Sequence, residues 1–123
     1  MRVLVCGGRD YANKDVVFEQ LDFAHRFVGI DLIIQGGAKG ADALAASWAK
    51  AREVECMEIK ADWDAHGKAA GPIRNRLMLE QGKPDWVYAF PGGRGTQNMI
   101  AQAKTALVSV LVIGDDEPAK VEW

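Results

Sequence analysis

The sequence has little cysteine, no long hydrophobic run and no excess of basic residues, and each absence excludes a class of protein. Its 123 residues include only two cysteines, Cys6 and Cys56, without the spacing of a zinc site. Both lie in predicted strands, so we expect buried thiols in a reducing compartment. No apolar run approaches the ~20 residues of a membrane-spanning helix, and the amino terminus lacks the layout of a signal peptide. We therefore expect a cytoplasmic protein with no membrane partner.

The net charge and the missing nucleotide motifs exclude further classes. A net charge of −2 argues against a nucleic-acid partner, because general nucleic-acid binders carry a basic excess. No Gly-x-Gly-x-x-Gly follows the first apolar run, and no Gly-x-x-x-x-Gly-Lys-Ser/Thr occurs, which argues against an NAD site and a P-loop NTPase. Apart from the pair Asp62 and Asp64, no acidic cluster suggests Mg²⁺. We predict no metal site and identify no resident cofactor.

Apolar runs alternate with helical patterns along the chain. Strands are predicted at residues 2–6, 31–35, 54–59, 85–90 and 107–113, and helices at 13–27, 41–52, 72–81 and 96–106, with a polar loop at 60–71. This alternation is typical of a single α/β domain, with a five-stranded parallel sheet and helices on both faces. Right-handed crossovers favour the strand order 3-2-1-4-5. We expect this domain to span residues 1–114 and residues 115–123 to form a C-terminal tail.

Glycine is concentrated in the loops that follow the predicted strands. Ten of the 13 glycines lie there, on the rim where open parallel sheets bind ligands. Glycine lets a ligand approach the backbone closely, although tight turns between a strand and a helix also need it. Residues 91–96, Pro-Gly-Gly-Arg-Gly-Thr, join a strand to a helix. Backbone N–H groups and the positive end of the helix dipole favour a phosphate at such a turn.

Three motifs together resemble the SLOG superfamily. They are the segment Gly-Gly-Ala-Lys-Gly-Ala-Asp at 36–42, the segment Arg-Asn-Arg at 74–76, and residues 91–96. This Rossmann-like superfamily includes the lonely-guy cytokinin-activating phosphoribohydrolases and the DNA-processing protein of natural transformation. The segments at 5–11 and 61–63 most resemble its small YspA-type, cpYpsA-related branch, and the resemblance covers residues 2–114. It implies a Rossmann-like fold, a small nucleotide or nucleotide-derived ligand as partner, and a homo-oligomer.

The turns and the resemblance define one set of candidate ligand-binding residues. They are Gly7, Gly8, Arg9, Gly36, Gly37, Gly40, Asp42, Arg74, Asn75, Pro91, Gly92, Gly93, Arg94, Gly95 and Thr96. The phosphate is expected on the 93–96 amides, although Thr96 could instead cap the last helix and Arg94 could point to solvent. Arg9 could bind an anionic group or pair with a neighbour such as Asp10. Trp63, in the polar loop, could stack on a base or anchor the loop.

One departure from the lonely-guy motif bears on catalysis. That motif reads Pro-Gly-Gly-x-Gly-Thr-x-x-Glu, and Met99 occupies the position of its glutamate. A thioether cannot transfer a proton as a carboxylate does, so the hydrolase activity does not carry over by motif and no catalytic residue is assigned. Two alternatives to ligand binding remain. One is a nucleoside-monophosphate phosphoribohydrolase that uses Asp10, Asp42 or Asp62, and the other is an accessory DNA-processing role.

Overall fold

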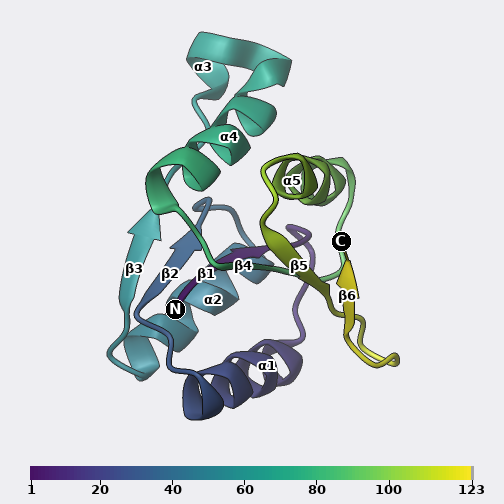
Figure 1. The fold of residues 1–123 in the computed structure, drawn as a ribbon. Coiled ribbons are helices and arrows are strands. Elements are labelled where there is room, and N and C mark those ends of the chain that lie inside the picture. Colours follow the sequence, from purple (N-terminus) through teal and green to yellow (C-terminus); the bar gives the residue numbers. More distant parts are fainter. Residues whose placement is uncertain (123) are drawn as a thin grey trace.

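A computed structural model describes residues 1–122, which form a six-stranded sheet between two layers of helices (Figure 1). The strands are β1 (Arg2–Cys6), β2 (Leu32–Gln35), β3 (Glu55–Glu58), β4 (Trp86–Ala89), β5 (Ser109–Val112) and β6 (Lys120–Glu122). The helices are α1 (Lys14–Phe27), α2 (Ala41–Ala51), α3 (Trp63–His66), α4 (Ala70–Gly82) and α5 (Arg94–Thr105), and a 3-10 turn, η1 (Gly67–Ala69), joins α3 to α4.

The strand order is β3-β2-β1-β4-β5-β6, and β1 to β5 are parallel. The predicted order of the first five strands is confirmed, but the predicted number of strands is wrong. β6 pairs antiparallel with β5, with Val112 opposite Lys120. It lies in the segment assigned to a tail, because a short charged run carries no strand signal. Pairing with β5 and a 2.7 Å ion pair between Lys104 and Glu122 hold it in place.

Each face of the sheet is covered by a pair of helices, as Figure 1 shows for α1 with α2 and for α4 with α5. Val3 and Leu4 of β1 are fully buried, on opposite faces, which explains the unbroken apolar run of this central strand. Leu21 and Trp48 pack in the core beneath α1 and α2, and Met78 packs in the core beneath α4 and α5. The parallel strands therefore end at one shared edge, where the glycine-rich loops meet.

Four local expectations fail for identifiable reasons. The predicted loop at 60–71 contains α3, whose first turn is capped by the Asp62 carboxylate, which accepts a 3.1 Å hydrogen bond from the Ala65 N–H. α5 begins two residues earlier than expected, with Gly93 as its N-cap. α4 likewise begins two residues earlier than expected, at Ala70. Cys56 is exposed because β3 is the edge strand of the sheet.

Within residues 1–122, no helix is both long enough and apolar enough to cross a bilayer.

Candidate functional site

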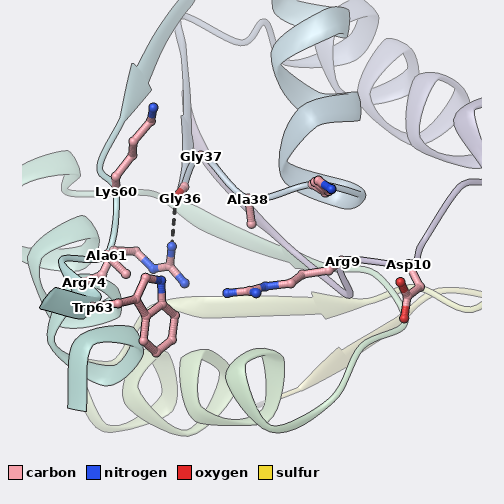
Figure 2. A pocket seen from close by; sticks show the side chains of 10 residues that line it. Arg9, Asp10, Gly36, Gly37, Ala38, Lys60, Ala61, Trp63 and Arg74 are labelled. Atoms are coloured by element: carbon pink, nitrogen blue, oxygen red, sulfur yellow. Dashed lines mark hydrogen bonds between the residues drawn. The ribbon is translucent and has the colours of Figure 1, made fainter. Parts of the chain in front are cut away.

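A cleft opens beyond the carboxyl ends of β1, β2 and β4. It consists of two neighbouring cavities of about 560 Å³ and about 280 Å³, and the larger is shown in Figure 2. Arg9, Ala38, Trp63 and Arg74 line both cavities, so these residues form the boundary between them. This location is the point where the winding of the sheet reverses, the usual place for a ligand in an open α/β sheet.

The amino-terminal end of α5 faces the smaller cavity. Gly93, Gly95 and Thr96 line that cavity, and within residues 1–122 no hydrogen bond occupies the backbone N–H groups of residues 92–96. A Cβ added at Gly93 or Gly95 would meet nothing within 4 Å. At Gly93 and Gly95, therefore, the amide is not paired with an acceptor of the protein, and the space where a side chain would lie is open.

Other glycines serve the packing of the loops. The Gly8 N–H donates a 2.8 Å hydrogen bond to the Pro91 carbonyl, and the Gly8 carbonyl accepts one of 3.3 Å from the Ala41 N–H. Gly40 has a φ of +76°, and a Cβ there would overlap the Gly8 carbonyl. A Cβ at Gly92 would overlap the Thr96 hydroxyl. These two glycines allow the three loops to meet, and neither lines the cleft.

Arg74 and Asn75 connect α4 to two of these loops. The Arg74 guanidinium donates a 2.8 Å hydrogen bond to the Gly36 carbonyl, drawn in Figure 2, and one of 3.1 Å to the Asn75 amide oxygen. Asn75 in turn donates a 3.2 Å hydrogen bond to the Gly95 carbonyl. The chain of hydrogen bonds holds a positive charge in the cleft and fixes α4 against the start of α5.

Asp42 is the buried carboxylate of the cleft. Burial raises the pKa of its carboxyl and is the largest influence on it. Hydrogen bonds from the Ala38 and Gly36 N–H groups and the positive charges of Arg74 and Arg9 act in the opposite direction. The Ala38 N–H donates a 3.2 Å hydrogen bond to it. Burial likewise raises the pKa of the neighbouring Cys6 thiol far above its ordinary value, so this thiol stays neutral and is a poor nucleophile.

Arg9 and Trp63 face each other across the cleft. The guanidinium carbon of Arg9 lies 5.5 Å from the centre of the indole ring of Trp63. Figure 2 shows the Arg9 side chain extended towards Trp63 and Arg74, with the Asp10 carboxylate at the other end, away from it. Among residues 1–122, Arg9 forms no ion pair within 4.0 Å. The expected alternative of a pair with Asp10 is therefore absent from the part of the chain that the structure describes.

The structure brings most of the candidate residues together. Those lining the cleft are Gly7, Gly8, Arg9, Gly36, Gly37, Asp42, Arg74, Asn75, Gly93, Gly95 and Thr96. Gly40, Pro91, Gly92 and Arg94 are not among the lining residues, and Arg94 is exposed.

Sequence reasoning left several lining residues out of the candidate set, Trp63, Lys60 and Gly71 among them. The available signal for Trp63 was a large aromatic residue in a polar segment that follows a strand. Met99 is fully buried in the core under α5, outside the cleft. In the range 1–122, no three His, Cys, Asp or Glu side chains gather as a metal site.

Comparisons with known proteins give two similarities. A model of the YAcAr family, described as the YspA, cpYpsA-related SLOG family, matches residues 1–66. The chain is 37% identical over 122 residues to the Gene 61 protein of Mycobacterium phage D29. That alignment covers 93% of this chain and 97% of the phage protein. The family match contains the loops after β1 and β2 together with Trp63, and so includes three of the segments that line the cleft.

Proposed function

The chain belongs to the YspA, cpYpsA-related SLOG family, and we propose that its cleft binds a nucleotide or a nucleotide-derived ligand. Membership of this family is consistent with nucleotide-related binding in general. The observation that carries the proposal is the set of unbonded N–H groups at Gly93, Gly95 and Thr96, which line the smaller cavity at the start of α5. A phosphate at this position would accept hydrogen bonds from them and lie at the positive end of the helix dipole.

Two arginines support an anionic ligand at the same place. Arg74 is held by its hydrogen bond to Gly36 and supplies a fixed positive charge. Arg9 is exposed and lines both cavities, so its guanidinium can move to a phosphate. Asp42 is the buried carboxylate nearby, and the positive charges of Arg74 and Arg9 partly offset its negative charge.

Titration calorimetry with AMP, GMP, CMP and UMP tests the proposal. Arg9→Ala should weaken binding about ten-fold or more, because a hydrogen bond to a charged group contributes about 1.5–3 kcal/mol. Gly93→Val should abolish binding, because its side chain enters the open space beside the amides. Arg76→Ala is the matched control, since Arg76 is exposed on the same helix as Arg74 but does not line the cleft.

The proposal is rejected if none of the four nucleotides binds. It is also rejected if Gly93→Val binds them as the unmodified protein does, or if Arg9→Ala has no larger effect than Arg76→Ala.

Asp42 supports a second candidate function, cleavage of the bond between base and ribose in a nucleoside monophosphate. Its carboxyl lines the smaller cavity, and burial raises its pKa, as suits a general acid. Asp62 is engaged in capping α3, and Asp10 lines the larger cavity but not the smaller one that the start of α5 faces. Incubation with nucleoside monophosphates should release free base, and Asp42→Asn should stop the release. Release no greater than from heat-denatured protein excludes this activity for those substrates.

A further inference from the structure

We infer that the ligand carries a planar aromatic ring that stacks on the indole of Trp63, in the place that the Arg9 guanidinium occupies in this structure. The inference rests on the proposed function and assigns the base-recognising residue of the same cleft. Arg9, once displaced from the indole, is then available to the anionic group of the ligand.

Trp63 does not anchor its segment to the core. Its side chain is 48% exposed, and it belongs to neither of the two hydrophobic clusters that form the interior. A solvent-exposed indole that lines a cavity is available for a planar ligand. The alternative of an anchoring role, which the sequence left open, lacks the buried contacts that it requires.

The indole nevertheless has a defined position. Asp62 caps the helix that carries Trp63, and a Cβ at Gly71 would lie 3.5 Å from the Cη2 atom at one edge of the indole. Because Gly71 has no side chain, an edge of the indole fits beside α4, and the Arg9 guanidinium lies over a face of the ring. Because the indole is already positioned, ordering it on binding costs little conformational entropy. A ligand that stacks on it therefore binds with a smaller loss of free energy than on a mobile side chain.

Arg9 marks the face that the ligand would use. Its guanidinium carbon lies 5.5 Å from the centre of the indole, and both side chains line both cavities. Stacking of a base on tryptophan is generally stronger than an exposed cation–π contact, so a base can replace the guanidinium.

One small molecule can reach both the indole and the turn that starts α5. Trp63, Gly93 and Thr96 all line the smaller cavity, whose volume is about 280 Å³. A nucleoside monophosphate has its ring and its phosphate at opposite ends of a ribose, which matches an aromatic group on one side of a cavity and open amides on the other.

The experiment compares AMP with ribose 5-phosphate, which has the same sugar phosphate and no ring. Trp63→Ala should weaken AMP binding by about five-fold to about a hundred-fold, the range expected for loss of one base–aromatic stack. It should leave the affinity for ribose 5-phosphate unchanged, whereas Arg9→Ala should weaken both. Trp63→Phe should restore part of the AMP affinity, and His66→Ala, an exposed position on the same short helix outside the cleft, is the matched control.

Fluorescence provides a readout that a structural role would not change. AMP should quench part of the tryptophan emission of the unmodified protein, and this quenching should disappear in Trp63→Phe while calorimetry still detects binding.

The outcomes separate the two proposals. The stacking inference fails, and the proposed function stands, if Trp63→Ala weakens both probes equally, or if it leaves AMP binding unchanged while Arg9→Ala weakens it. Both fail if neither probe binds.

Discussion

Asp42 links the cleft to the pH dependence of folding. Its pKa is raised above 3.8 by burial, so between 3.8 and the raised value the folded protein holds more protons than the unfolded chain. As the pH rises through that range, the contribution of this carboxyl to the free energy of unfolding falls. Above the raised pKa the contribution falls no further.

We expect Asp42→Asn to remove this contribution, because an amide cannot ionise and its oxygen can still accept the hydrogen bond from the Ala38 N–H. Urea unfolding at a series of pH values from acidic to neutral measures the effect. The stability of Asp42→Asn relative to the unmodified protein should increase as the pH rises from 3.8 and then level off. A constant difference across this series would contradict the assignment of a raised pKa.

Substitution by alanine should change the free energy of unfolding differently at two glycines on the same rim of the sheet. Gly40→Ala should lower the free energy of unfolding by about 2 kcal/mol or more, because its φ is +76° and its new Cβ overlaps the Gly8 carbonyl. Gly93→Ala, with a φ of −104° and no atom within 4 Å of the new Cβ, should lower it by less than about 1 kcal/mol. Urea unfolding of the pair measures the difference, and equal losses would contradict the distinction between a packing glycine and a ligand-facing glycine.

At the scale of elements, α1 depends on a side-chain cap at its first turn. The side chain of Asn13 accepts a 3.2 Å hydrogen bond from the Val16 N–H at the start of the helix. Asn13→Ala should therefore lower the free energy of unfolding by about 1 kcal/mol. Asn13→Asp is the control, since a carboxylate caps equally well and suits the helix dipole. If both variants lower the free energy of unfolding equally, the loss in Asn13→Ala does not come from the missing cap.

At the scale of the whole molecule, α1 leaves an apolar surface uncovered. Phe23, Phe27 and Val28 are 66%, 64% and 70% exposed, and the rings of the two phenylalanines lie 4.7 Å apart. Glu19 lies towards the start of this helix and Arg26 towards its end. An antiparallel pairing of two copies that set Arg26 of each opposite Glu19 of the other would bring opposite charges together. We therefore expect a second copy of this chain, related by a two-fold axis, to cover this surface.

Light scattering coupled to size-exclusion chromatography tests this expectation. The unmodified protein should run as a dimer, and the double substitution Phe23→Ser with Phe27→Ser should convert it to a monomer without unfolding it, since both side chains are exposed. Leu107→Ser is the control, because Leu107 is 93% exposed but lies after α5, away from this surface. A monomeric unmodified protein, or a dimer that survives the double substitution, would contradict it.

The sequence alone determined the order of the first five strands and the edge where their loops meet. The apolar run at residues 2–6 requires burial on both faces, and alternation with helices requires parallel pairing, so the loops after β1, β2 and β4 must converge. Arg9 and the turn at 91–96 were found in this way, whereas Arg74 was suggested by the resemblance to the SLOG superfamily.

Only the tertiary structure decided what each residue does at that edge. Gly40 and Gly93 are the same residue type in similar turns, and their different roles depend on which atoms of distant segments lie beside them. Trp63 faces the cleft because the short helix that holds it packs on α4, and β6 is a strand because β5 offers it an edge. Local patterns encode which elements form, whereas the environment of a side chain depends on contacts between segments far apart in the chain.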